Sequence, residues 1–263
     1  MEEVTEGHHF VLVHGAGHGA WCWFKLRCLL EASGHRVSCP DLASAGIHPA
    51  DPNSILSIDE YDAPLFGLMS ALPEHEKVIM VGHSAGGLSV THALHVFSNK
   101  IKVAIFVAAT MLPWGYQTEE DIKDGVPDLS RFGDVYELKY SMGPNNPPTS
   151  VALRKEFQRK ILYQLNPIED STLASMLLRP WPATLPSTRF HKDKVDGLKH
   201  ARRVYIKTTH DNMVNPQQQD AMIRRWPPDD VLVMETDHSP FFSAPMELFK
   251  LVMKASTCAH DVP

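Results

Sequence analysis

Short apolar runs alternate along the chain with amphipathic segments of helical length. Continuous apolar runs of about four to eight residues, bounded by turn-forming residues, are typical of buried strands. We predict such strands at residues 10–13, 36–39, 77–81, 101–108, 204–207 and 231–234. Since helical segments follow most of them, the pattern predicts an α/β fold with a mostly parallel sheet covered by helices on both faces.

Apolar residues at helical spacing predict the accompanying helices. These lie at residues 21–32, 88–97, 217–225 and 246–255, and one more follows Ser57. Ser57 and Glu60 match a capping box, in which side chains close the first turn of a helix. Pro64 falls inside this last helix, so we expect the helix to bend there or to begin later.

The alternation is interrupted between residues 110 and 191. This stretch is rich in Pro, Met, Tyr and Trp, with an amphipathic helical segment at 154–165 and no clear buried strand. Gly, Pro and Asn at 143–148 predict a loop. We interpret 110–191 as a mainly helical cap inserted into a core formed by residues 1–109 and 192–263.

Composition places the chain among ordinary globular proteins. Of its 263 residues, 43% are hydrophobic and 21% are charged, which argues against disorder and against a coiled coil. The net charge of −6 gives no basic surface for nucleic acid. No apolar run reaches the roughly 18 residues that a membrane helix needs. The acidic N-terminus also lacks the pattern of a signal peptide.

The cysteines and histidines indicate neither disulfides nor a metal site. Cys22, Cys28, Cys39 and Cys258 lack C-x-x-C spacing, so we expect reduced thiols in a cytoplasmic protein. The 15 histidines include no H-E-x-x-H motif and no cluster with cysteine. We therefore expect no metal and no other cofactor.

The sharpest chemical signal is the segment Gly82-His83-Ser84-Ala85-Gly86. It follows a predicted buried strand and precedes a predicted helix, as the G-x-S-x-G elbow of a nucleophilic serine does. Small residues two positions before and after the serine let the turn close, so that the hydroxyl stands above the sheet. A turn without chemistry is the alternative, and the flanking strand and helix favour the elbow.

A nucleophilic serine needs a base, and the base needs a carboxylate that orients it. In this type of fold the chain order is Ser, then Asp or Glu, then His. Asp211 and His238 each follow a predicted strand, so they lie at the same sheet edge as Ser84. Other residues are placed less well. His210 and Asp237 are adjacent to Asp211 and His238, Asp229 and Asp230 precede a predicted strand, and His260 lies near the end of the chain.

The negative charge that develops on an attacked ester needs preorganised N–H donors. The backbone N–H of Ala85, next to the serine, is one candidate donor. The second is expected in a loop after an early strand, where His14-Gly15-Ala16-Gly17 stands and Ala16 is our candidate. Neither of the Gly-rich phosphate-binding motifs occurs there.

Aromatic and methionine side chains of the cap can line an apolar pocket, although each of them alone is more simply explained by packing. They are Met111, Trp114, Tyr116, Phe132, Tyr136, Phe157, Tyr163, Met176 and Trp181. As a group they predict a small apolar or aromatic substrate.

Three motifs are informative in combination. They are H-F-V-L-V-H-G-A-G-H-G-A-W-C-W near the start, V-G-H-S-A-G-G-L at the elbow, and D-H-S-P-F-F-S near the end. With them the chain resembles the plant carboxyl methylesterases of the α/β-hydrolase superfamily, a family that also contains alkaloid esterases and hydroxynitrile lyases. The resemblance covers residues 9–255, nearly the whole chain.

The resemblance implies both an activity and a set of site residues. Ser84, Asp211 and His238 match the positions of the family's catalytic triad, and Ala16 and Ala85 match its oxyanion hole. The implied reaction is hydrolysis of the methyl ester of a small carboxylic acid, without cofactor or metal. Family substrates include the methyl esters of indole-3-acetate, jasmonate and salicylate. A homodimer is also compatible with the resemblance.

Two features narrow the choice within the family. The lyases have Thr after the first-strand His and Lys after the catalytic His, whereas Gly15 and Ser239 stand there in this chain, which disfavours lyase chemistry. D-H-S-P-F-F-S and the segment at residues 123–129 are most similar to the methyl indole-3-acetate esterase branch. Three alternatives stay open: demethylation of a larger specialised metabolite, a lyase, or a receptor that keeps the triad for ligand binding.

Overall fold

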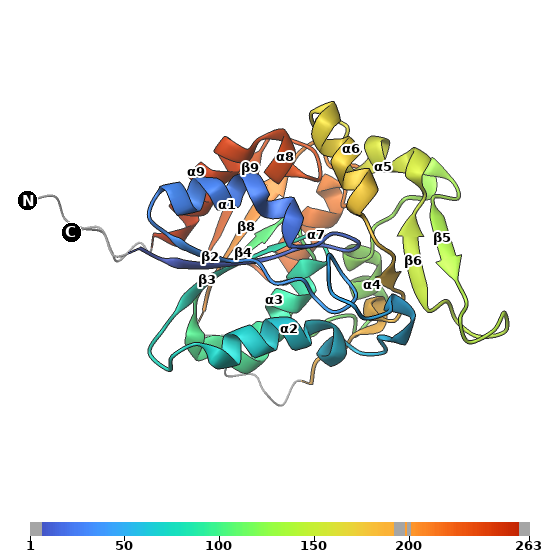
Figure 1. Ribbon diagram of the computed structural model, residues 1–263, viewed down its shortest axis with the longest axis horizontal. Helices are drawn as coiled ribbons and strands as arrows, with labels where there is room; N and C mark the ends of the chain where they lie inside the picture. Colours follow the sequence, from blue (N-terminus) through green and yellow to red (C-terminus); the bar gives the residue numbers. More distant parts are fainter. Residues whose placement is uncertain (1–6, 192–197, 199–200, 258–263) are drawn as a thin grey trace, which may run out of the picture.

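The computed structural model describes residues 7–191, 198 and 201–257 (Figure 1). Six parallel strands form the main sheet of this described part, in the order β2-β1-β3-β4-β8-β9. They are β1 (His9–Val13), β2 (Arg36–Ser38), β3 (Val78–His83), β4 (Ile101–Val107), β8 (Arg202–Thr208) and β9 (Asp230–Met234). Each overlaps a strand expected from the apolar pattern, and the expectation of a mostly parallel sheet is confirmed.

Helices cover both faces of this sheet (Figure 1). In β1, Val11 and Val13 face one core, whereas Phe10 and Leu12 face the other. The first core is closed by α2 (Ile58–Ala71), α3 (Gly86–Phe97) and α7 (Pro216–Arg225), and the second by α1 (Phe24–Ala32), α8 (Pro240–Ser243) and α9 (Pro245–Ser256). Because each fully buried Leu, Val, Ile or Phe side chain contributes about 1.5–3 kcal/mol, the two cores hold the strand ends firmly.

The capping-box pattern correctly marks the start of α2, but only its Ser57 half forms, because the Glu60 carboxylate accepts from the Leu56 N–H and not from the Ser57 N–H. The Ser57 side chain accepts a hydrogen bond from the Glu60 N–H at 3.2 Å, and the helix begins at Ile58. Pro64 lies inside the helix, so the expectation of a later start is wrong. Burial of Tyr61, Leu65 and Met69 in the first core compensates for the backbone hydrogen bond that proline cannot donate.

The residues between β4 and β8 lie outside the main sheet. Their helices are α4 (Glu119–Gly125), α5 (Lys155–Leu162) and α6 (Ile168–Leu177), and a small antiparallel sheet contains β5 (Tyr136–Lys139), β6 (Ser150–Leu153) and β7 (Trp181–Pro182). This second sheet is absent from the sequence-based expectation, because its strands are largely half-exposed or exposed and leave no apolar run. The exact boundaries of the cap stay a prediction, since residues 192–197 lie outside the described ranges.

Short 3-10 helices connect several of these elements, at η1 (Ala20–Trp23), η2 (Pro52–Ser54), η3 (Ser98–Lys100), η4 (Ser130–Phe132) and η5 (Leu185–Ser187). Within the described ranges no helix is both long and apolar enough to cross a membrane. In the same ranges no three His, Cys, Asp or Glu side chains are grouped so as to hold a metal ion. Cys22, Cys28 and Cys39 are free thiols, and Cys258 lies outside the described residues.

Candidate active site

The strand order creates a crevice at one edge of the sheet. From β1 the chain forms β2 on one side and then returns to form β3 on the other side. Open parallel sheets bind ligands at the carboxyl ends of their strands, at such a change of direction. Ser84 directly follows β3, and Gly15 and Ala16 follow β1, so the predicted nucleophile and the predicted oxyanion loop meet at this point.

Ser84 occupies a strained turn between β3 and α3. Its φ angle is +54°, a left-handed conformation that is uncommon for residues other than glycine and costs about 1–3 kcal/mol. The turn is held by backbone hydrogen bonds: the Ser84 N–H donates to the Val107 carbonyl (3.2 Å), and its own carbonyl accepts from the amides of Gly87 and Thr110 (3.0 Å each). Both neighbouring segments therefore hold Ser84 in this strained conformation.

Close backbone packing explains the glycines around the serine. A Cβ atom on Gly82 would lie 3.0 Å from the Gly86 carbonyl oxygen, and one on Gly86 would lie 2.5 Å from the His14 carbonyl oxygen. A Cβ atom on Gly15 would lie 2.8 Å from Ser84 Cβ. A side chain at Gly15 or Gly86 would push the elbow away from the residues at the end of β1, and one at Gly82 would push β3 away from α3.

A continuous chain of hydrogen bonds joins the three predicted catalytic residues. His238 Nε2 lies 3.0 Å from Ser84 Oγ, and His238 Nδ1 lies 2.8 Å from Asp211 Oδ2. All three residues are buried, with exposed fractions of 8%, 1% and 2% for Ser84, His238 and Asp211. Because a carboxylate only accepts, the imidazole proton sits on Nδ1, and Nε2 is free to take the serine proton.

Asp211 is fixed by donors on both of its oxygens. Oδ1 accepts from the backbone amides of Met213 and Val214, at 2.8 Å each, and Oδ2 accepts from the Thr208 hydroxyl at 2.9 Å. These bonds hold the carboxylate in one orientation toward the imidazole, as the role of an orienting group requires.

The alternative acid and base residues lie away from this chain of hydrogen bonds. His210 is exposed, whereas Asp237 is buried and accepts a backbone N–H from the segment after α5. Asp229 and Asp230 are exposed at the start of β9, and His260 lies outside the described residues.

The two predicted oxyanion donors both border the cavity in front of the serine. Ala85 is the N-cap residue of α3, so its N–H is among the first helix donors that lack a partner inside the helix. The positive end of the α3 dipole points the same way. Ala16 stands across the crevice, in the loop after β1. The two residues therefore border the same cavity from two neighbouring loops.

Two buried histidines beside the site were not singled out in the sequence. His18 Nδ1 donates to the Ala16 carbonyl at 3.0 Å, and His83 Nε2 donates to the His238 carbonyl at 2.7 Å. Burial lowers the pKa of His18 to about 3 and the pKa of His83 well below its ordinary value, so both rings are neutral. Both residues stand inside the first two motifs, but their spacing alone does not indicate what they contact.

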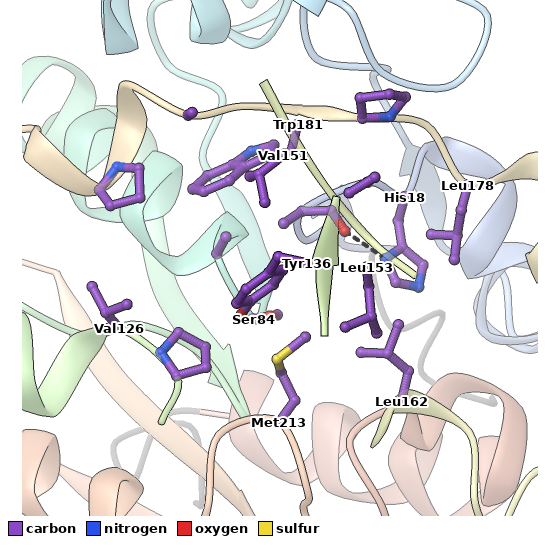
Figure 2. Close-up of a pocket in the computed structure, with 18 of the residues that line it drawn as sticks. His18, Ser84, Val126, Tyr136, Val151, Leu153, Leu162, Leu178, Trp181 and Met213 are labelled. Carbon is purple, nitrogen blue, oxygen red and sulfur yellow. Dashed lines mark hydrogen bonds between the residues drawn. The ribbon is translucent and has the colours of Figure 1, made fainter. Parts of the chain in front are cut away.

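An apolar cavity of about 380 Å³ opens in front of Ser84, large enough for a drug-sized ligand. Figure 2 shows its labelled walls, which include Val126, Tyr136, Val151, Leu153, Leu162, Leu178, Trp181 and Met213. The apolar lining with few polar groups fits the expectation of an apolar or aromatic substrate.

The aromatic and methionine residues suggested from the cap have three different environments. Tyr116, Tyr136 and Trp181 line the cavity. Met176 is 75% exposed, and the remaining ones pack in the two cores: Met111, Trp114, Phe132, Phe157 and Tyr163. Much of the wall is instead aliphatic, contributed by β6 and by the ends of helices, and no local signal distinguishes those residues from ordinary packing.

Comparison with known proteins gives a consistent result. The profile of the α/β hydrolase family matches residues 10–251. Methylesterase 17 of Arabidopsis thaliana is 50% identical over 257 residues, which are 97% of this chain and 93% of that protein. A pheophorbidase of Raphanus sativus is 42% identical, covering 94% of this chain and 93% of its own length. The crystal structure of methylesterase MES16 from Arabidopsis superposes with a TM-score of 0.82 at 43% identity, over 94% of this chain and 98% of that one.

Proposed function

The chain belongs to the α/β hydrolase family, and within it to the plant methylesterases; from this premise we propose that it hydrolyses the methyl ester of a small aromatic carboxylic acid, with methyl indole-3-acetate as the preferred substrate. Ser84, His238 and Asp211 are the proposed catalytic triad. The observation that carries the proposal is the unbroken hydrogen-bond chain from Asp211 through His238 to Ser84. Ser84, at the end of this chain, borders an apolar cavity.

In the proposed acylation step, His238 Nε2 takes the proton from Ser84 Oγ as the oxygen attacks the ester carbonyl. Asp211 stabilises the charged imidazole and keeps its orientation. The N–H groups of Ala16 and Ala85 stabilise the negative oxygen of the tetrahedral intermediate. His238 then gives its proton to the departing methoxide, and methanol leaves behind an acyl group on Ser84.

Deacylation repeats these roles with water as the nucleophile. His238 takes a proton from water, the hydroxide attacks the acyl carbonyl, and the same two N–H groups stabilise the second tetrahedral intermediate. The proton returns to Ser84 Oγ as the acyl bond breaks. The products are the free carboxylic acid and methanol, and this chain's own residues carry every proton transfer.

The substrate preference rests on the cavity wall. Val126 and Pro127 border the cavity, and they belong to the segment that is most similar to the methyl indole-3-acetate esterase branch. Gln218 Nε2 donates to the Val126 carbonyl at 2.7 Å, so α7 holds this wall in place. Tyr136 and Trp181 add aromatic surface (Figure 2), which favours a flat acyl group such as indole-3-acetyl.

The site favours ester hydrolysis over cyanohydrin cleavage. Gly15 packs so closely on Ser84 that a Cβ atom would lie 2.8 Å from Ser84 Cβ, which leaves no room for the threonine found in the lyases. Ser239 carries no charge that could hold a departing cyanide. Both features support the esterase proposal.

The test is methanol release from a panel of purified methyl esters. The panel contains the esters of indole-3-acetate, jasmonate and salicylate and one bulky ester, and cyanide release from the cyanohydrin mandelonitrile is measured beside it. We expect the highest kcat/KM for methyl indole-3-acetate. A higher value for the bulky ester, or cyanide release as fast as ester cleavage, would contradict the proposed substrate. Tight ligand binding with no multiple turnover would favour a receptor.

The proposal includes a cytoplasmic location, with which the free thiols Cys22, Cys28 and Cys39 agree, since such a compartment keeps cysteines reduced. Fractionation of cells that express the protein would test it. The homodimer remains a separate hypothesis, which light scattering at several protein concentrations would test.

A further inference from the structure

The segment between α5 and α6, residues 163–166, contacts three loops of the site at once. Each of its residues donates a hydrogen bond to one of these loops. The bonds run from the Tyr163 hydroxyl to His18 Nε2, from Gln164 Nε2 to the His210 carbonyl, from the Leu165 N–H to Asp237 and from Asn166 Nδ2 to the Ser239 carbonyl. The segment therefore joins the residues after β4 to the loops that follow β1, β8 and β9.

The direction of the first bond follows from its partners. The Ala16 carbonyl only accepts, so the proton of His18 must sit on Nδ1. Burial keeps the His18 ring neutral by lowering its pKa to about 3, which leaves Nε2 as an acceptor. The buried Tyr163 hydroxyl, whose pKa burial raises well above its ordinary value, is then the donor to Nε2 at 2.7 Å.

We propose that Tyr163 is a positioning residue for ester hydrolysis: by donating to His18 Nε2 it holds the His18 ring in place, and His18 Nδ1–H in turn holds the Ala16 carbonyl so that the Ala16 N–H faces the oxyanion. Tyr163 itself is not among the residues that line the cavity. The inference rests on the proposed function, because it assigns a purpose to the proposed oxyanion donor Ala16.

Losing the tyrosine hydroxyl leaves the buried His18 Nε2 without its donor, so the imidazole ring is free to turn or to shift away from the Ala16 carbonyl. Without the bond from Nδ1–H, the Ala16–Gly17 peptide can turn, and the Ala16 Cα, which joins it to the Gly15–Ala16 peptide, carries the Ala16 N–H away from the oxyanion. A misplacement of about 1 Å costs about 10²-fold in rate. Because the oxyanion forms only after the ester has bound, the loss falls on kcat rather than on substrate binding.

The experiment compares Tyr163→Phe with Tyr205→Phe. Both variants keep a buried ring and lose a hydroxyl hydrogen bond, because the Tyr205 hydroxyl donates to the Ala109 carbonyl at 2.9 Å. We expect kcat to fall about 10- to 100-fold in Tyr163→Phe, with KM within threefold of wild type. In Tyr205→Phe we expect kcat within twofold of wild type. Equal losses in the two variants would overturn the proposal.

Side-chain ¹⁵N NMR supplies a readout that a merely structural role would not change. We expect the His18 Nδ1–H signal, assigned by its loss in His18→Asn, to be shifted downfield by its hydrogen bond to the Ala16 carbonyl in wild type and to move upfield or disappear in Tyr163→Phe. An unchanged Nδ1–H signal in Tyr163→Phe would overturn the proposal.

A second pair of variants serves if Tyr163→Phe does not fold. Asparagine at position 18 carries its amide nitrogen near the Nδ1 position and can still donate to the Ala16 carbonyl, whereas glutamine carries its amide nitrogen near the Nε2 position. We expect kcat of His18→Asn to exceed that of His18→Gln at least tenfold, and equal values would contradict the proposal. Ser84→Ala separates the two hypotheses: turnover retained there refutes the proposed function, whereas turnover lost there and kept in Tyr163→Phe refutes only this inference.

Discussion

Replacing Gly15 with alanine tests how tightly the loop after β1 packs on the nucleophile. The new Cβ atom would lie 2.8 Å from Ser84 Cβ and 3.1 Å from His83 Nδ1. Carbon atoms that are not bonded prefer about 3.5–4.0 Å, so the loop and the elbow must separate by roughly 0.7–1.2 Å. Such a displacement corresponds to a loss of about 100-fold in kcat. Overpacking should also lower the free energy of unfolding by about 1–3 kcal/mol.

Gly67→Ala is the matched control for this substitution. Gly67 is an exposed residue of α2, and a Cβ atom there would meet no heavy atom within 4 Å. Alanine should therefore raise the free energy of unfolding by about 0.5–1 kcal/mol and leave kcat unchanged. The assays are methanol release at saturating ester and urea unfolding. A Gly15→Ala enzyme with kcat within threefold of wild type would refute the packing argument.

The remaining predictions concern the carboxylate, the buried histidine and a helix cap. Asp211→Asn should lower kcat about 10³- to 10⁴-fold at saturating ester, and a loss below tenfold would contradict the triad. His18 has a pKa of about 3 in the folded protein against an ordinary 6.5. The unfolded chain therefore takes up a proton first, and the free energy of unfolding falls by about 1 kcal/mol per pH unit as the pH drops from 6.5 toward 3. Urea unfolding of His18→Asn between pH 7 and 4 should therefore show a shallower decline than wild type, and an equal slope would contradict the assignment. Ser57→Ala should lower the free energy of unfolding by about 1 kcal/mol without changing kcat, and a change in kcat beyond twofold would speak against a purely local cap.

The main sheet and the juxtaposition of Ser84, Asp211 and His238 could be predicted because they depend on local patterns and one rule of topology. Apolar runs identify the buried strands, and parallel strands bring the loops that follow them to one edge. With the serine on its elbow, residues that follow later strands lie at the same sheet edge and within its reach. The structure brings all three within hydrogen-bond distance.

The walls of the cavity and the supports of the site could not be predicted in the same way. β5 and β6 are largely exposed or half-exposed, so their residues carry no periodic apolar signal. Tyr163 and His18 are 145 positions apart, and nothing in the sequence of either segment indicates the other. Such contacts depend on how the residues between β4 and β8 pack against the sheet edge.

The most direct test of the account is methanol release from methyl indole-3-acetate by wild type and by Ser84→Ala, with unfolding curves to show that both proteins are folded. The account predicts rapid release by wild type and a rate below a hundredth of it in the variant, because the nucleophile that forms the acyl intermediate is gone. Release by folded Ser84→Ala above a hundredth of the wild-type rate would contradict the proposed mechanism.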